Sequence, residues 1–328
     1  MGFNMGDLPA LETIAPTAFE AVALPRRPDA PRLSRARCEV VRPIGILDQH
    51  GEHRQIDIPT ERPLTIYLDK RELVTLMTLG ANPELLVLGY LLNQGLVEQV
   101  GEIDGIDVDW AVEAAAVRTR HGVSDLEARI ARRVVTTGCG QGTVFGDAMA
   151  QLGQTRLPDA QAARLSHATL ISLLDQMKLR DSVHRQAGSV HGCALFHGDA
   201  LQCFVEDVGR HNAIDTVAGW MAVHGVQGGD KVFYTTGRLT SEMVIKSARM
   251  GVPIIVSRNG VTAMGHQLAE TLGMTLFGRA AGRHFLCYTG FERFDAEAPP
   301  PTVPLAFTDT AHEKTPGRPK FSHPPRGA

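Results

Sequence analysis

The sequence predicts an α/β protein with two domains, a smaller strand-rich α+β domain at residues 37–135 and an α/β domain at residues 155–294. The length supports this, because 328 residues are more typical of two domains than of one. From residue 183 onward, short apolar strand patterns alternate with longer helical patterns. This alternation indicates helices that cover a sheet that is at least partly parallel.

The two ends of the chain are predicted to be flexible tails. Residues 1–36 carry five prolines and show no apolar periodicity, and residues 295–328 have the same Pro-rich character. Segments of this composition bury too little apolar surface to hold one conformation.

The first domain is expected to open with strands. The runs RCEVVRPIGI (37–46) and RPLTIYLDKRELVTLMTL (62–79) are rich in Val, Ile, Thr and Leu. The second run predicts a hairpin that turns at Asp69 and Lys70, since a charged break separates two strand-like stretches.

A helix is expected to follow at NPELLVLGYLLNQG (82–95). Asn82 suits the N-cap, Pro83 the first helical position and Gly95 the end of the helix. Further strands are expected within VDWAVEAAAVRTRHG (108–122) and at the end of this domain.

The second domain is expected to begin with a helix at 159–179, where leucines recur at helical spacing. The alternating region then predicts strands at 192–207, 230–237, 252–259 and 284–290, and helices at 211–223, 240–251 and 263–273.

Composition excludes several classes of protein. The formal net charge is −3, which argues against nucleic-acid binding by bulk electrostatics. The longest apolar run, residues 85–92, is far shorter than the roughly 20 residues of a membrane-spanning helix. The first residues lack the basic region of a secretory signal. We therefore expect a cytoplasmic protein with neither a nucleic-acid nor a membrane partner.

The cysteines point to single-thiol chemistry. They number five, are widely spaced and include no C-x-x-C pair, which argues against a disulfide framework and a zinc ribbon. Cys139 lies in VVTTGCGQGTVF (134–145) between two glycines, within a predicted mobile loop at residues 136–154. Its thiol is expected to be accessible, as a covalent carrier requires. An incidental loop cysteine is the alternative. Cys193, Cys203 and Cys287 lie in strand patterns and are expected to be buried and inert.

Three expected strand-to-helix junctions carry an arginine, namely Arg210, Arg238 and Arg258. In open α/β sheets, ligands bind beyond the carboxyl ends of strands, where helix N-termini present free N–H groups. Guanidinium groups at that edge favour phosphate. As an alternative, each arginine pairs with a neighbouring carboxylate of Glu206, Asp207 or Glu242.

Known phosphate and hydrolase motifs are absent. GVQGGDK lacks the P-loop spacing, GCGQGT lacks the third glycine of a dinucleotide fingerprint, and no H-E-x-x-H occurs. A phosphate site would therefore be assembled from several loops. His211, beside Arg210, is the histidine best placed to contribute, with a structural role as its alternative.

Residues 40–290 resemble the formate dehydrogenase accessory sulfurtransferase family, also called sulfur carrier proteins. The strongest blocks are TTGCG (136–140), FVEDVGRHNAIDTV (204–217) and YTTGRLTSEMVIKSARMGVPIIVSRNGVT (234–262). The last two are too long and specific to match by chance.

The resemblance implies a function. Members receive sulfur as a cysteine persulfide from a cysteine desulfurase. They pass it to the molybdenum (or tungsten) bis-molybdopterin guanine dinucleotide cofactor that formate dehydrogenase requires, and the family's loop cysteine falls on Cys139. Members form homodimers, and their second domain resembles the three-layer fold of cytidine deaminases. The family's cofactor-binding segment corresponds to Arg279, Ala280, Ala281, Gly282, Arg283 and His284.

The chain departs from the family in two places. Many relatives have a second cysteine three positions after the first, where this chain has Gly142, so a disulfide within the loop cannot form. The segment 279–284 also differs in its order of aromatic, arginine and glycine residues.

Two other functions stay open at this point. A chaperone that binds the cofactor without carrying sulfur would tolerate the missing cysteine. A deaminase-type enzyme would need the H-x-E and P-C-x-x-C zinc signature, which is absent here, so we predict no catalytic zinc.

Overall fold

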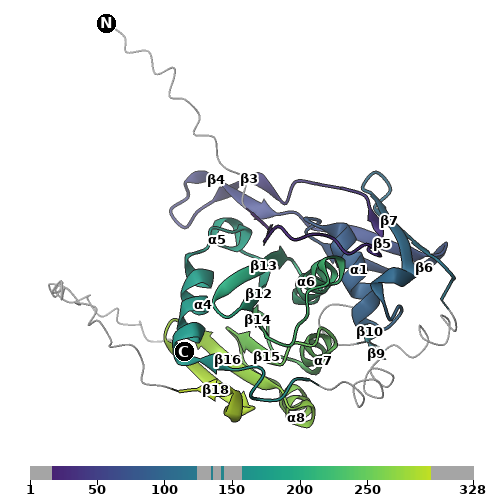
Figure 1. The fold of residues 1–328 in the computed structure, drawn as a ribbon. Coiled ribbons are helices and arrows are strands. Elements are labelled where there is room, and N and C mark those ends of the chain that lie inside the picture. The colour runs from purple at the N-terminus through teal and green to yellow at the C-terminus, as the bar shows by residue number, and fades with distance from the viewer. Residues whose placement is uncertain (1–16, 124–133, 136–141, 144–156, 297–328) are drawn as a thin grey trace, which may run out of the picture.

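The computed structural model describes residues 17–123, 134–135, 142–143 and 157–296. Two larger sheets organise these residues, one with seven strands and one with five (Figure 1). None of the helices in the described part of the chain is long and apolar enough to cross a membrane.

The seven-stranded sheet is mixed. Its strands, in spatial order, are β1 (Phe19–Ala21), β13 (Ala200–Asp207), β12 (His191–His197), β14 (Lys231–Thr235), β15 (Ile254–Ser257), β16 (Thr275–Ala281) and β17 (His284–Thr289). The central β14, β15 and β16 run parallel and the other pairs are antiparallel, so the prediction of a partly parallel sheet is confirmed.

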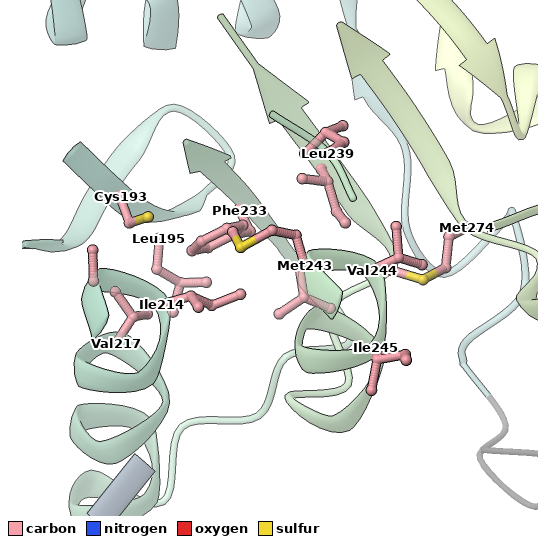
Figure 2. Packing of buried hydrophobic residues seen from close by; sticks show 14 of the residues in the cluster. Cys193, Leu195, Ile214, Val217, Phe233, Leu239, Met243, Val244, Ile245 and Met274 are labelled. Carbon is pink, nitrogen blue, oxygen red and sulfur yellow. The ribbon is translucent and has the colours of Figure 1, made fainter. Parts of the chain in front are cut away.

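Helices cover both faces of this sheet, which gives three layers. On one face lie α6 (Arg210–His224), α7 (Ser241–Arg249) and α8 (Ala263–Leu272), whose apolar side chains pack against alternate residues of the strands (Figure 2). On the other face, α4 (His167–Leu179) packs its leucines against Phe196 and Phe204. The short helix α5 (Val183–Ala187) follows α4. The specific likeness to cytidine deaminases stays a prediction.

The five-stranded sheet has the order β2 (Arg32–Leu33), β7 (Ile103–Asp109), β8 (Ala114–Thr119), β5 (Arg62–Leu68) and β6 (Arg71–Thr78). The predicted hairpin joins β5 and β6, and Asp69 and Lys70 at its turn have positive φ angles of 47° and 74°. Helix α1 (Pro83–Asn93) packs on this sheet and completes a second apolar core.

The two sheets are joined where α1 crosses α6. A Cβ atom added at Gly89 of α1 would lie 1.7 Å from the Asp215 carbonyl oxygen of α6. A Cβ added at Gly219 of α6 would lie 2.0 Å from the Leu85 carbonyl oxygen of α1. Each helix therefore presents a glycine to the backbone of the other, and no other residue type fits this approach.

Two pairs of short strands and a hairpin complete the architecture. The remaining elements are the hairpin β3 (Val41–Leu47) and β4 (His53–Pro59), the pair β9 (Val134–Val135) and β10 (Gly142–Thr143), the pair β11 (Leu165–Ser166) and β18 (Phe294–Asp295), and the 3₁₀ turns Val100–Glu102 and Phe291–Arg293.

The predicted tail at residues 1–36 was too long. Residues 17–33 contain β1, which pairs with β13, and β2, which pairs with β7. A stretch of two or three residues is too short for its own sequence pattern to predict a strand. Strands β1 and β2 form because the edge of a larger sheet supplies their hydrogen-bond partners. The predicted tail 295–328 and loop 136–154 lie mostly outside the described residues.

Several element boundaries also differ from the predictions. The run 192–207 is a hairpin rather than one strand, and 108–122 spans the end of β7 and all of β8. Helix α4 begins at His167, eight residues later than expected, and β16 was not predicted. Asn82 precedes α1 but makes no capping bond, because its Oδ1 accepts a hydrogen bond from Arg37 Nη1 at 2.7 Å.

Candidate functional site

The three arginine junctions lie at one edge of the seven-stranded sheet. Strands β13, β14 and β15 point the same way, and each leads through a short loop into a helix. Arg210 opens α6, Arg238 lies between β14 and α7, and Arg258 directly follows β15. Of the carboxylates at this edge, Glu242 lies within ion-pair distance of His211 and Lys246, and Asp207 accepts its hydrogen bonds from Thr78, Leu79, Gly209 and Asn212. The edge therefore brings three guanidinium groups to the ends of neighbouring strands.

Arg210 and Arg238 differ in exposure. Arg210 is only 7% exposed, and its side chain lies across Gly237, where an added Cβ would come within 2.6 Å of Arg210 Cδ. Its Nε finds no hydrogen-bond partner in the part of the chain that the structure describes. Arg238 is exposed on the same loop as Gly237. Arg210 is thus buried at this edge, whereas Arg238 is accessible to a ligand.

A buried polar network lies beneath this edge. His211 Nε2 is 3.2 Å from Glu242 Oε2, and Lys246 donates to Asp215 at 2.7 Å and lies 3.8 Å from Glu242. Asn93 of α1 donates to the other Asp215 oxygen at 2.7 Å. Burial lowers the pKa of His211 to about 2, with Lys246 adding to the effect, so its imidazole is neutral. The network joins α1, α6 and α7, and this favours the structural role for His211.

Asp207 ties the two sheets together at the same edge. Its carboxylate accepts hydrogen bonds from the Thr78 hydroxyl at 2.5 Å and the Leu79 amide at 3.1 Å, both at the end of β6. It also accepts bonds from the Gly209 amide at 3.1 Å and Asn212 Nδ2 at 2.8 Å. Burial raises the pKa of Asp207 to about 6, although these four donors favour its ionised form.

A cavity of about 440 Å³ opens beside the arginine edge, on the α4 face of the sheet. Basic side chains and one carboxylate line it. The basic side chains are Lys178, Arg180, His184, Arg185 and Arg258, and the carboxylate is that of Glu206. The lining has more basic side chains than acidic ones, which favours an anionic ligand.

The floor and walls of the cavity are partly apolar. Phe204 lies beneath the Arg180 guanidinium, which is 5.0 Å above the ring and also bonded to Glu20 of β1. Burial raises the pKa of Tyr234 to about 12, so its hydroxyl stays protonated. Burial also raises the pKa of Glu206, although the His184 amide donates to it at 3.3 Å. A planar group and a phosphate would both find suitable contacts.

The predicted segment 279–284 is only partly at this cavity. It forms the tip of the β16–β17 hairpin, where Ala280, Ala281 and Gly282 line the cavity together with Arg258. Arg283 and His284 are exposed and do not line it. Arg279 has a positive φ of 52°, and its amide donates to the Asn259 carbonyl at 2.8 Å, which fixes the hairpin against the loop after β15.

Sequence reasoning missed the basic groups at residues 178–185. The run KLRDSVHR carries four of the five basic side chains of the cavity, and this density was the available signal. The run lies in the connection from α4 through α5, far along the chain from Arg258. Only the packing of α4 on the sheet brings the two together.

A second cavity of about 860 Å³ lies where α1, α6 and α7 end. Its lining includes Asn93 of the buried network, together with Arg27 and Arg249. Arg249 Nη1 donates to the Leu92 carbonyl at the end of α1 at 3.1 Å. None of the predicted site residues that the structure describes lines this cavity.

The described cysteines are poor nucleophiles. Burial raises the pKa of the thiols of Cys38 and Cys203, that of Cys193 to about 12 and that of Cys287 to about 11. Cys193 lies inside the apolar core against α6 (Figure 2). Cys139 lies outside the described residues. Within the described ranges, no group of three or more His, Cys, Asp or Glu side chains is arranged to hold a metal ion.

Comparisons with known proteins agree on one family. The sequence model of the FdhD/NarQ family matches residues 59–295. The chain is 31% identical to "Sulfur carrier protein FdhD" of Listeria innocua, over 74% of this chain and 94% of that protein. It is 30% identical to the protein of the same name from Bacillus subtilis, over 75% and 94%. A crystal structure of a putative formate dehydrogenase accessory protein from Desulfotalea psychrophila superposes with a TM-score of 0.62 and 27% identity, covering 78% of this chain and 98% of that one.

Proposed function

The chain belongs to the FdhD/NarQ family, and we propose that it is a sulfur carrier that serves the maturation of formate dehydrogenase. In this proposal Cys139 accepts sulfur as a persulfide from a cysteine desulfurase. The acceptor of that sulfur is the molybdenum bis-molybdopterin guanine dinucleotide cofactor, which is the substrate of the protein. The reaction would take place in the cytoplasm, and the protein would act as a homodimer.

One observation carries the proposal, namely the state of the other thiols. The chain has five cysteines, and burial raises the pKa of all four that the structure describes. Sulfur transfer requires a thiolate that a partner protein can reach. Cys139, between two glycines in the TTGCG block, is the cysteine that remains for this role.

The loading step conserves atoms and electrons. The Cys139 thiolate attacks the terminal sulfur of the desulfurase persulfide, the S–S bond breaks, and the desulfurase cysteine leaves as a thiolate. The product is a persulfide on Cys139. Delivery of its terminal sulfur to the metal centre as sulfide requires two electrons, which we assign to a thiol reductant. Gly142 excludes a second loop thiol at that position, so this reductant is external.

The cavity beside the arginine edge supports the substrate part of the proposal. Lys178, Arg185 and Arg258 offer cationic groups to the phosphates of a dinucleotide. Phe204 and Tyr234 provide apolar and hydroxyl contacts for a base. Ala280 and Gly282 have no bulky side chain, so the backbone of the hairpin tip can approach the ligand closely. Arg238 would extend the cationic surface along the sheet edge.

Intact-protein mass spectrometry tests the sulfur-carrier proposal. The full chain and its Cys139→Ser variant are incubated without oxygen with a cysteine desulfurase and cysteine. We expect one added sulfur atom on the natural chain alone, removable by a thiol reductant. An unmodified natural chain, with a desulfurase shown to be active, would contradict the proposal.

The cavity also suits a second function, a chaperone that binds the cofactor without carrying sulfur. Its basic groups can hold an anionic ligand without any thiol. The Cys139→Ala variant distinguishes the two functions in cells that depend on this chain for an active formate dehydrogenase. A sulfur carrier loses the activity in this variant, and a chaperone keeps it.

A further inference from the structure

Strand β1 contributes a carboxylate to the α4 face of the seven-stranded sheet. Glu20 lies directly opposite Phe204 of β13, and residues directly opposite each other share a face. Its neighbours Phe19 and Ala21 pack against the apolar core on the α6 face. Glu20 therefore points to the α4 face, where the 440 Å³ cavity opens. The strand precedes residues 59–295, which match the family, so this carboxylate comes from outside the matched region.

Glu20 holds the side chain of Arg180, the residue that follows α4. Arg180 Nη1 donates a hydrogen bond to the Glu20 carboxylate, and the guanidinium carbon lies 5.0 Å from the centre of the Phe204 ring. The Arg180 side chain is only 16% exposed. A free arginine side chain has many rotamers, but here a hydrogen bond and the ring beneath fix its position before a ligand arrives.

The same contacts make Arg180 less suited to a phosphate. The Glu20 carboxylate offsets its charge, and the Phe204 ring occupies one side of the guanidinium. Arg180 also lines the cavity, so the side away from the ring is available to a ligand. Guanidinium planes stack on nucleobases as well as on aromatic rings. Arg180 therefore suits the base of a nucleotide better than its phosphates.

The position of Arg180 in the cavity agrees with this role. It lies over β13, whereas Arg258 follows β15. The sheet order β13–β12–β14–β15 separates these two strands by three spacings, or roughly 14 Å. Three apolar side chains of the lining come from α4 and β13, the elements that adjoin Arg180, namely Leu174, Met177 and Phe204. A base at Arg180 and phosphates at Arg258 would thus lie on opposite sides of the cavity, as they do in an extended nucleotide.

We propose that Glu20 is a positioning residue, which holds Arg180 on Phe204 as a platform for the purine base of the bound nucleotide. This assignment rests on the nucleotide-bearing substrate proposed above, and it adds the group that recognises the base. Glu20 acts through Arg180 alone. Its side chain is 53% exposed, so it can be replaced without disturbing the core.

Isothermal titration calorimetry of the full chain with two probes tests the proposal. GDP carries the base and pyrophosphate lacks it, so the ratio of their dissociation constants isolates the contribution of the base. We expect Glu20→Ala and Arg180→Met to reduce the preference for GDP over pyrophosphate about tenfold, within the range that base stacking contributes. Arg180→Lys should do the same, since lysine keeps the charge and lacks the plane. Asp181→Ala is the matched control, because Asp181 is exposed beside Arg180 and does not line the cavity.

The ratio separates recognition of the base from a purely structural role. If Glu20 and Arg180 only stabilised β1, their variants would bind both probes more weakly by the same factor, and the proposal would be wrong. An Arg180→Lys variant that kept the preference for GDP would also overturn it, because charge rather than the plane would then act. Melting temperatures from circular dichroism show that the variants are folded.

The natural chain distinguishes this proposal from the one on which it rests. Binding of neither probe would overturn the proposed nucleotide substrate and the role of Glu20 together. Binding of GDP with an unchanged preference in Glu20→Ala would overturn the role of Glu20 alone. Persulfide loading of Cys139 is a separate measurement on the same samples.

Discussion

Replacing Gly89 with alanine should force α1 and α6 apart. The new Cβ would lie 1.7 Å from the Asp215 carbonyl oxygen, and Cβ atoms do not approach other atoms closer than about 3.0 Å. The helices must therefore separate by at least 1.3 Å at their crossing. The obstacle is backbone rather than the end of a flexible side chain, so no rotamer change relieves it.

The magnitude follows from two opposing effects. Overpacking of a well-packed core typically costs about 1–3 kcal/mol, and a backbone clash belongs at or above the upper end of this range. Alanine in a helix interior is favoured over glycine by about 1 kcal/mol. The net loss in the free energy of unfolding is therefore at least about 2 kcal/mol. In a chain of this size that corresponds to a fall in melting temperature of about 4–8 °C.

Thermal unfolding followed by circular dichroism measures this change. Gly45→Ala is the matched control, because a Cβ at Gly45 has no atom within 4 Å. We expect the control to melt within a degree or two of the natural chain. If Gly89→Ala left the melting temperature unchanged or raised it, the two helices could separate without loss, and the inferred close packing at the crossing would be wrong.

Three further predictions concern the charged groups at the sheet edge. Lys246→Met leaves Asp215 buried without its cation and should lower the free energy of unfolding, measured with urea, by about 3–5 kcal/mol. The double variant Lys246→Met/Asp215→Asn should recover most of this loss. Equal losses in the single and the double variant would contradict the prediction. The pKa of Asp207 is raised from 3.8 to about 6, so its folded state favours the protonated form, and about 3 kcal/mol of stability present below pH 4 is lost as the pH rises to 6. The Asp207→Asn variant has no carboxyl group to titrate and should not show this loss. Urea unfolding at pH 4 and pH 7 should therefore show the free energy of unfolding of the natural chain falling relative to that of the variant. An equal difference between the two chains at both pH values would refute the assignment. Arg258→Ala should weaken binding of GDP, as a probe for the nucleotide, about tenfold or more in calorimetry and leave persulfide loading intact, whereas Arg283→Ala, outside the cavity, should bind normally.

The arginine edge was predictable because it depends only on element order. Arg210, Arg238 and Arg258 each follow a strand and precede a helix, and chain order alone places such junctions at the carboxyl ends of strands. The basic run at residues 178–185 was not assigned to the site, since its position depends on how α4 packs across the sheet.

Predictions from local sequence failed where the structure depends on a residue distant in the chain. Asn82 has the right type and position to cap α1, but Arg37 lies close enough to take its side-chain oxygen. Strand β1 has only three residues and follows a Pro-rich stretch, so its own pattern gave no signal. Its partner β13 comes much later in the chain. Position-by-position propensity contains no information about such partners.

The pairing of β1 with β13 has a consequence for synthesis on the ribosome. Phe19 pairs with Val205, which is added to the chain 186 residues later. At about 5–20 residues per second, β1 waits roughly 10–40 s for its partner strand to be made. Throughout this interval residues 19–21 are an unpaired strand in the nascent chain. Strand β1 therefore stays without its partner until β2 through β12 have all been translated, and chaperones have that interval in which to bind it.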